Sequence, residues 1–258
     1  MAIHTNLKSL TPRRENFKRE VTLISGGFYD RKALPGGKIT VYPWDSHIDN
    51  WFQERLRLPN KEYALWEAVE KVADLNGCQL RSMTMGDVWT VLMVSKSIRT
   101  DCVVDYYVRC PRCERGEKAT IRVPDELQIL GKKAPDYAGV DDITLPDSKD
   151  VVTFRPMTVG DNMWIMERDA EKRQKLPDLI AGILLPIKAV GGGSVDNTDE
   201  ILNWYNALSP KDAEFLKTEQ GKLHPQLDTA VQHKCDSCGE KFTYDLDLNR
   251  DFFRVGER

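Results

Sequence analysis

Apolar and polar positions in the first third of the chain predict a strand pair followed by two helices. A short apolar stretch at 21–29 ends in a Gly-Gly turn, and residues 38–43 alternate after a second Gly-Gly pair, which indicates a strand-turn-strand element. From Asn60 to Leu75, apolar residues recur every three or four positions, which predicts an amphipathic helix with Gly77 as its C-cap glycine. A second helix is predicted over 85–99.

The rest of the chain mixes short strands with a run of helices. We expect strands at 103–109, 118–123, 151–155, 227–234 and 242–248. Helices are predicted at 158–174, 177–190, 197–207 and 210–220. The stretch 131–149, rich in Gly, Pro and Asp, is expected to be a long loop. Gly191 to Gly193 are expected to form a flexible break between two helices, and Gly221 to follow the end of the last one.

One octapeptide occurs twice in similar form. Residues 80–87 (LRSMTMGD) resemble residues 154–161 (FRPMTVGD), and a Trp-containing apolar helix follows each. In both we expect the threonine to cap the helix and the aspartate three residues later to accept hydrogen bonds from free N–H groups. Duplication and the reuse of an ordinary capped corner are equally compatible with this pattern, and neither implies catalysis.

Charge and composition exclude several classes of protein. The 258 residues carry 37 Lys and Arg against 40 Asp and Glu, with the signs interspersed, which argues against a nucleic-acid coat or a polybasic membrane binder. The longest apolar run, at 179–187, is too short to span a bilayer and is broken by Pro186. The first thirty residues are charged and contain no signal segment, so we expect the thiols to remain in a reducing cytoplasm.

Four of the six cysteines form the strongest chemical signal. Cys110 and Cys113 are separated by two residues, as are Cys235 and Cys238, and each pair lies between two predicted strands. Two such turns present four thiolates in the tetrahedral set that structural zinc prefers, which predicts one zinc-ribbon-like site. The 121 residues between the pairs would then be an insertion clamped at both ends. A thioredoxin-like redox pair and reduced cysteines without metal are the alternatives.

The remaining candidates are weaker. His233 precedes Cys235 by two residues and is either a strand side chain or a substitute ligand, whereas Cys78 and Cys102 are expected to pack as small apolar groups. Among other polar groups we note the three histidines without a partner pattern and the acidic loop, namely His4, His47, His224, Asp141, Asp142 and Asp147. The basic residues at the first knuckle, Arg109, Arg112, Arg115 and Lys118, would also suit a nucleic-acid-binding ribbon. The chain has no P-loop, nucleophile elbow or zinc-protease motif, so we expect no enzyme and no small-molecule substrate.

These features predict an α+β fold with small antiparallel strand elements, a zinc-ribbon-like pair of Cys knuckles and a mainly helical insertion. We divide the chain into a polar N-terminal arm (1–20), an α+β region with the first knuckle (21–123), a loop and helical insertion (124–226), and the second knuckle hairpin with a C-terminal tail (227–258).

The order of several short motifs resembles a known family. These motifs are LISGGFY at 23–29, the strand at 39–43, the segment at 80–87, YVRCPRC at 107–113, FRPMTVGD at 154–161, CDSCG at 235–239 and DFFR at 251–254. Together they are similar to the T4-type baseplate protein family of contractile-tailed bacteriophages, whose members are associated with the baseplate hub. The family usually has a proline before the serine of the first motif, where this chain has Ile24.

The resemblance implies a structural or assembly role in a phage tail, with other baseplate or tail proteins as partners and no enzymatic activity. We therefore expect the protein in the virion, at the tail baseplate, after assembly in the bacterial host cytoplasm. Exposed Trp residues would suit such contacts, and Trp44, Trp51 and Trp204 are the candidates, with core burial as the alternative. An assembly chaperone that leaves the particle and a zinc-ribbon regulator that binds nucleic acid remain alternative functions.

Overall fold

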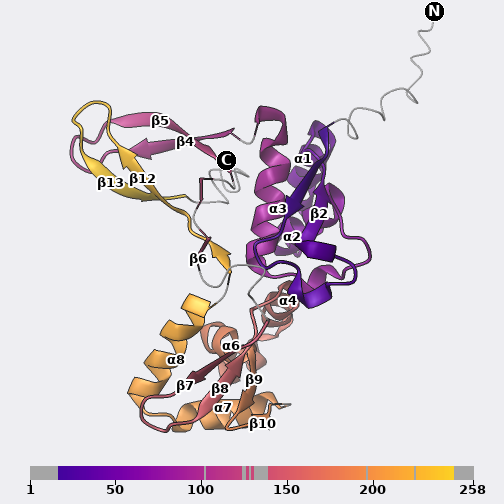
Figure 1. The fold of residues 1–258 in the computed structure, drawn as a ribbon, viewed down its shortest axis with the longest axis vertical. Coiled ribbons are helices and arrows are strands. Elements are labelled where there is room, and N and C mark those ends of the chain that lie inside the picture. The colour runs from indigo at the N-terminus through magenta and orange to yellow at the C-terminus, as the bar shows by residue number, and fades with distance from the viewer. Residues whose placement is uncertain are drawn as a thin grey trace, which may run out of the picture.

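Two hydrophobic cores and a pair of β-ribbons make up the structure (Figure 1). The computed structural model describes residues 17–246, except 102, 124–125, 128, 131–138, 196 and 224. Most of the predicted N-terminal arm therefore lies outside the described residues, as do the C-terminal tail from residue 247, His4, Cys102 and His224.

The first core is built mainly from an antiparallel sheet and three helices, and buried side chains at Tyr106, Val108 and Ile121 belong to the same cluster. The strands pair in the order β1 (Arg19–Thr22), β2 (Lys38–Val41) and β3 (Ala73–Asp74), which confirms the predicted strand-turn-strand element. The helices are α1 (Ser46–Arg55), α2 (Ala64–Val72) and α3 (Met85–Ser97). Short 3-10 turns connect these elements at Phe28–Asp30, Pro35–Gly37, Lys61–Tyr63, Leu80–Ser82 and Ile98–Thr100.

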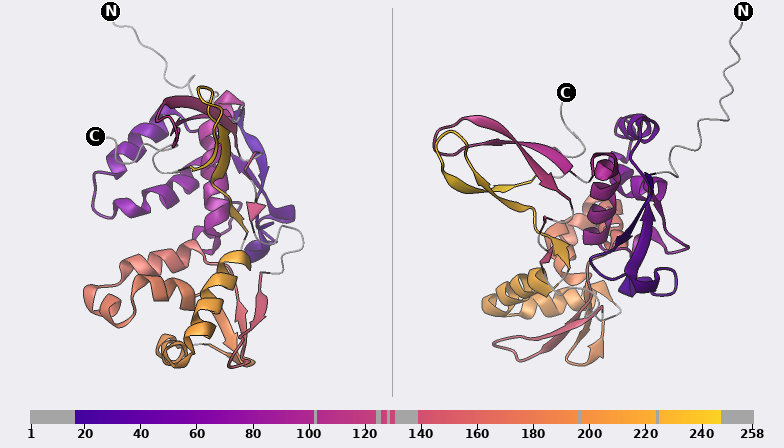
Figure 2. Two further views of the ribbon diagram at one scale, coloured as in Figure 1. Left: turned by 90° about the vertical axis from the view of Figure 1, so that its left-hand side faces the viewer. Right: turned by 45° about the horizontal axis from the view of Figure 1, so that its top comes forward.

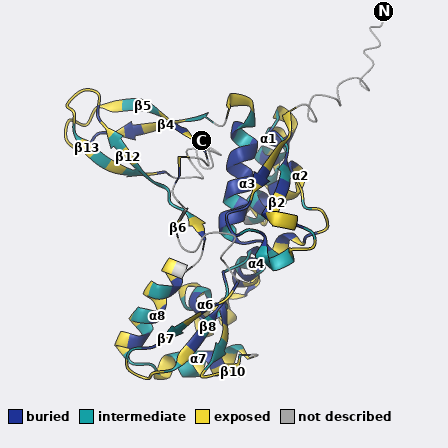
Figure 3. Ribbon diagram, viewed as in Figure 1, coloured by how far each residue is buried: buried dark blue, intermediate teal, exposed yellow. Residues whose placement is uncertain are grey.

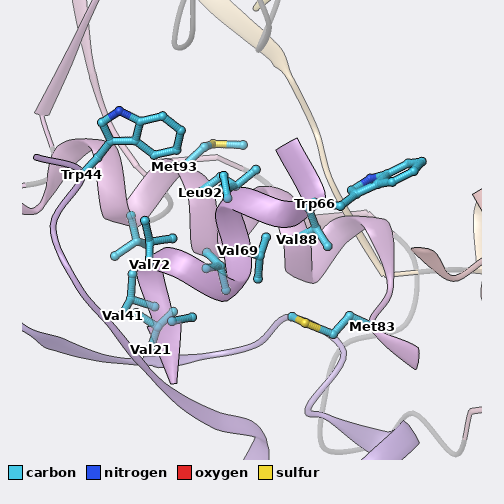
Figure 4. Packing of buried hydrophobic residues seen from close by; sticks show 14 of the residues in the cluster. Val21, Val41, Trp44, Trp66, Val69, Val72, Met83, Val88, Leu92 and Met93 are labelled. Atoms are coloured by element: carbon cyan, nitrogen blue, oxygen red, sulfur yellow. The ribbon is translucent and has the colours of Figure 1, made fainter. Parts of the chain in front are cut away.

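Helix α3 is the centre of this core. Its apolar residues are spread around the helix, and the structure buries it on nearly every side, as the dark blue ribbon of Figure 3 shows. Val88, Leu92 and Met93 pack in one cluster with side chains from α2 and from β1 and β2 (Figure 4). The helix begins where the sequence predicts, because the hydroxyl of Thr84 accepts a hydrogen bond of 3.3 Å from the N–H of Asp87.

A buried carboxylate joins α3 to the Ser-Gly-Gly-Phe-Tyr segment. Asp87 is fully buried and accepts hydrogen bonds from the Ser25 N–H at 3.1 Å, from the Ser25 hydroxyl, and from the Tyr29 hydroxyl at 2.9 Å. Burial raises the pKa of Asp87 above its ordinary value. The turn before Tyr29 needs glycine, since Gly26 and Gly27 have left-handed φ values of 68° and 63° and a Cβ on Gly27 would lie 3.0 Å from the Leu34 Cβ. The motif therefore has a structural explanation.

The second core holds a four-stranded antiparallel sheet and the helices of the insertion. The sheet order is β10 (Gly193–Ser194), β9 (Ile187–Val190), β8 (Val151–Phe154) and β7 (Asp141–Thr144). The helices are α4 (Val159–Glu167), α5 (Ala170–Lys175), α6 (Asp178–Leu184), α7 (Thr198–Ala207) and α8 (Pro210–Leu223). Phe154, Leu184 and Leu216 are buried at its centre. Helix α4 contributes to both cores, with Met163 in the first and Ile165 in the second.

Three expectations about this unit were wrong. Residues 177–190 were expected to be one helix, but α6 ends before Pro186, and Ile187–Val190 pair with β8 as a strand. The glycines at 191 and 192 have left-handed φ values of 58° and 82° and make the turn between β9 and β10, so they are no flexible break between helices. The segment 131–149 was expected to be a loop, yet it contains β7.

Smaller differences concern helix ends. The predicted helix at 158–174 is divided, because Asp169 caps a new helix, α5, by accepting from the Lys172 N–H at 2.9 Å. Gly77 does not cap α2, which ends at Val72, but lies in the turn after β3. Gly221 lies inside α8. Helix α1 was not predicted, although Asp45 caps it in the ordinary way.

The two similar octapeptides meet in space. Thr84 and Thr158 form an isolated antiparallel bridge, and the Val159 N–H donates to the Met83 carbonyl at 2.9 Å. Thr158 caps α4 as predicted, within a capping box completed by Asp161. The two capped corners therefore lie against each other where the two cores join.

Two ribbons project beside this body and meet at their turns (Figures 1 and 2). The first consists of β4 (Val103–Arg109) and β5 (Gly116–Arg122), the second of β12 (Ala230–Lys234) and β13 (Lys241–Asp245). Below them, β6 (Ile129–Leu130) pairs with β11 (Gln226–Leu227) and brings the two ends of the insertion together. The described part of the chain is therefore α+β, as predicted.

Candidate metal centre

The two cysteine turns have the same backbone construction. In each ribbon the residue before the first cysteine pairs with the residue six positions after that cysteine, Arg109 with Gly116 and Lys234 with Lys241. The N–H of Cys110 donates to the Arg115 carbonyl at 3.0 Å, and the N–H of Cys235 donates to the Glu240 carbonyl at 2.8 Å. The two ribbons therefore present their cysteines in equivalent positions.

The residue after the second cysteine adopts a left-handed conformation in both turns. Its φ is 58° at Glu114 and 73° at Gly239, and its N–H donates to the carbonyl of the first cysteine at 2.9 Å in each case. Glycine suits this conformation, whereas a side chain is strained in it. The second turn thus has the residue that its backbone favours, and the first does not.

The four predicted ligands come together at the meeting point of the ribbons. Their sulfur atoms all lie within 4.8 Å of one another. Cys110 Sγ is 3.6 Å from Cys238 Sγ, and Cys113 Sγ is 3.7 Å from Cys235 Sγ. A tetrahedral zinc ion with bonds of about 2.3 Å would set its sulfurs about 3.8 Å apart. All four are free thiols. The donor set fits one structural zinc ion.

The thiols of the site differ in acidity: the pKa of Cys110 is lowered, whereas, despite backbone hydrogen bonds that act to lower it, burial and the neighbouring thiols raise the pKa of Cys235 and Cys238. The Cys113 N–H hydrogen-bonds to the sulfur of Cys110 and lowers the pKa of that thiol to about 7. Thiolates are the form that binds metal. Cys110 and Cys235 are buried, while Cys113 and Cys238 are at the surface. Four thiolates complete a tetrahedral shell and leave no position for water or substrate.

Side chains connect the two turns around the sulfurs. Arg112 pairs with Glu240 at 3.2 Å, and Arg115 donates to the Ser237 hydroxyl at 3.0 Å. Glu117 on β5 reaches His233 on β12. Sequence reasoning did not identify Glu117, because its partners lie more than a hundred residues away along the chain and no spacing pattern marks it.

The basic residues of the first knuckle have partners within the protein. Arg109 pairs with Glu114 at 3.0 Å, and Lys118 pairs with Asp105 at 2.6 Å. With the contacts of Arg112 and Arg115 just described, all four basic candidates are engaged. This arrangement does not resemble an open basic patch for phosphates.

The other candidates do not join the site. His233 directs Nε2 to Glu117 and is not among the grouped ligands. Cys78 is buried in the first core as expected, and burial raises the pKa of its thiol to about 11. Asp142 accepts from Thr153 at 2.6 Å, and Asp147 pairs with Lys211 at 2.8 Å. Within the described ranges, the four cysteines are the only group of three or more potential ligands.

Comparison with known families decides the wider identity. The model of a family described as T4 bacteriophage base plate protein matches residues 84–254, about two thirds of the chain. The chain belongs to this family. The matched range starts at the cap of α3 and contains both cysteine knuckles, so the candidate metal centre lies inside the base plate protein match.

Other comparisons add no relative to this base plate protein. No curated protein and no solved structure is significantly similar to the chain. No helix in the described part of the chain combines the length and the apolar character needed to cross a membrane.

Proposed function

We propose that this protein is a zinc-stabilised structural subunit of a contractile phage tail baseplate, located in the hub region and acting through protein-protein contacts. The observation that carries the proposal is the family match over residues 84–254. The protein is a component of the virion tail in this proposal, and it is assembled in the host cytoplasm, where its thiols are reduced and can take up metal.

In this proposal Cys110, Cys113, Cys235 and Cys238 hold one zinc ion. When bound, the ion supplies a closed tetrahedral centre that links the two ribbons and adds to folding stability. The role is structural and not enzymatic, because four thiolates leave no coordination site for a reacting group. A link between segments 121 residues apart would keep the ribbons together in a particle exposed to the environment.

The partners in this proposal are other baseplate or tail proteins. Among the described residues, the two most exposed large apolar side chains are Tyr107 on the first ribbon and Leu179 on α6, 72% and 66% exposed, and Tyr is a residue type enriched at the centres of protein interfaces. The tryptophans are less available. Trp44 is buried, Trp51 is covered by Lys71, and the Trp204 indole N–H donates to Asp150 at 3.1 Å.

Mass spectrometry of purified, intact virions tests the structural role. We expect peptides of this chain in a fixed ratio to known baseplate subunits, and cross-links from the ribbons to neighbouring tail proteins. Its absence from intact particles, together with its presence in assembly intermediates, would contradict a structural subunit and favour the assembly chaperone.

A binding titration separates the nucleic-acid alternative. Because the basic residues of the first knuckle are paired with groups of the protein itself, we expect little binding of DNA or RNA even at low salt. Tight binding that weakens steeply with salt would favour the regulator and overturn the proposal.

A further inference from the structure

The two knuckles share one backbone plan but differ in sequence outside their cysteines, and two of the differing positions are in contact with each other across the ribbons or replace such a contact. The residue after the first cysteine is Pro111 in one knuckle and Asp236 in the other. The residue seven positions after the first cysteine is Glu117 in the first ribbon and Phe242 in the second. Since the registers of the ribbons agree, these differences occur at matching points and distinguish the two halves of the site.

Glu117 uses both carboxylate oxygens on the opposite ribbon. Its Oε1 accepts from His233 Nε2 at 2.7 Å, and its Oε2 accepts from the Asp236 N–H at 3.1 Å. The side chains of Glu117 and His233 are only 12% and 14% exposed. These hydrogen bonds hold the pKa of Glu117 below its ordinary value. One partner is therefore the backbone of the second knuckle itself, between its two cysteines.

Aromatic packing fixes the histidine that shares this carboxylate. The His233 ring packs edge-on against Phe242, with ring centres 5.4 Å apart, and near Tyr106 at 6.4 Å. Tyr106 in turn stacks on Tyr244 across the two ribbons at 5.6 Å. The imidazole cannot turn freely in this stack, so its Nε2 has a defined direction toward Glu117.

The contrast with Pro111 explains why only one knuckle needs such a contact. Proline has no N–H and fixes its own φ near −65°, so the first turn is preset by its sequence. Asp236 has an N–H at the same position, and a carboxylate accepts such a hydrogen bond more strongly than a neutral oxygen. Partners outside the ligand shell that hold ligands in place commonly strengthen metal binding.

We propose that Glu117 is a positioning residue for the metal centre: from the first ribbon it holds the Cys235–Cys238 turn in the conformation that binds zinc. The first ribbon is then the template on which the second ribbon docks. This inference rests on the proposed zinc site and concerns one position of each turn: Pro111 fixes its own backbone in the first knuckle, whereas the equivalent Asp236 N–H is held by Glu117 of the other ribbon.

Zinc affinity measured by competition with a chromophoric chelator tests the inference on the full chain. We expect Glu117→Ala to weaken zinc binding by about 10-fold to 100-fold. Glu117→Gln should recover part of the loss, because its amide oxygen can still accept from Asp236. The matched control is Asp105→Asn, which removes the same charge from the same ribbon but touches Lys118; it should bind zinc like the wild type.

A double-mutant cycle examines the proposed contact itself. Asp236→Pro gives the second knuckle the residue that the first one has and removes the N–H that Glu117 accepts. In that background, Glu117→Ala should cost at least threefold less zinc affinity than in the wild type, because only the His233 contact remains to be lost. An equal loss in both backgrounds would overturn the inference.

A further measurement uses the zinc-loaded wild type alone and so does not depend on a variant that folds. Hydrogen exchange should show strong protection of the Asp236 N–H, and rapid exchange there would contradict the inference. If the wild type binds one zinc but Glu117→Ala binds it equally tightly, only the positioning role fails. If the wild type binds no zinc, the proposed metal centre fails with it.

Discussion

We expect free zinc to stabilise the folded chain by a fixed amount for each decade of zinc concentration. The four sulfurs come from two knuckles with 121 residues between them, so no short stretch of the unfolded chain contains more than two of these four sulfurs. Zinc should therefore bind the folded state far more tightly. For one ion, the free energy of unfolding then rises by about 1.4 kcal/mol per tenfold increase in free zinc above Kd, and reaches about 2.7 kcal/mol at a hundredfold excess.

The assay is chemical denaturation at several buffered concentrations of free zinc. Tryptophan fluorescence follows both cores, because Trp66 lies in the first and Trp204 packs against the second, and circular dichroism shows whether both unfold together. The double variant Cys110→Ser, Cys113→Ser removes one knuckle and should lose the zinc response. Cys78→Ala is the matched control, because it removes a buried thiol of the first core. Its free energy of unfolding should be lower than that of the wild type at every zinc concentration but should rise by the same amount per decade of free zinc.

Three results would refute this reasoning. A wild-type stability independent of free zinc would mean that the folded chain holds no ion. A slope near 2.8 kcal/mol per decade would mean two ions, each bound separately by one knuckle. An unchanged slope in the double variant would mean that the ion binds elsewhere.

Three further substitutions test other parts of the structure. Gly86→Ala should lower the free energy of unfolding by about 1 to 3 kcal/mol, because its Cβ would lie 2.6 Å from Ile24 Cδ1 and 2.7 Å from the Pro225 carbonyl oxygen. Gly221→Ala is the control, since nothing lies within 4 Å of its Cβ, and it should be neutral or stabilising. Asp161→Asn should cost about 2 to 3 kcal/mol near neutral pH, since the Asp161 carboxylate pairs with Arg155 at 2.5 Å and 2.7 Å. Burial alone would raise the pKa of Asp161, but the Arg155 contact lowers it in the folded chain. The stability that this variant lacks relative to the wild type, measured by denaturation across pH, should therefore be fully present above the ordinary Asp pKa of about 4. This difference should vanish as the pH falls through the lower pKa of the folded chain. Gly239→Ala should lower the free energy of unfolding of the zinc-loaded protein by about 1 kcal/mol, because φ at this position is 73°, where a side chain is strained. Equal unfolding midpoints for the variant and the wild type would contradict the role given to this glycine.

Local rules were enough to predict the elements whose signals are local. The thiol spacing identified both knuckles, the apolar run after Thr84 identified α3, and the Thr158 cap identified α4. Each of these depends on residues within one turn or one helix. The family resemblance was likewise carried by the order of short motifs and agrees with the match over residues 84–254.

The errors occurred where pairing with another segment decides the local structure. Residues 187–190 have an apolar pattern that suits a helix or a strand, and pairing with β8 selects the strand. Strand β7 lies in a segment rich in turn-forming residues and is a strand because β8 pairs with it. Glu117 has no distinguishing feature in the sequence, and its role follows only from the contact with the Asp236 N–H of the second knuckle. The partners of residues 187–190 and of Glu117 lie far along the chain, whereas β8 follows β7 directly in a hairpin and the turn-forming residues of the segment concealed the strand.

The most direct test of the central claim is the metal content of the full chain purified without chelators. Elemental analysis should give one zinc per chain, and replacement by cobalt should give the absorption of a tetrahedral four-thiolate site, since all four sulfurs lie within 4.8 Å of one another. Both signals should disappear when the cysteines of either knuckle are replaced. A chain without bound metal, or one that keeps its metal after loss of one knuckle, would contradict a zinc ion that joins the two ribbons.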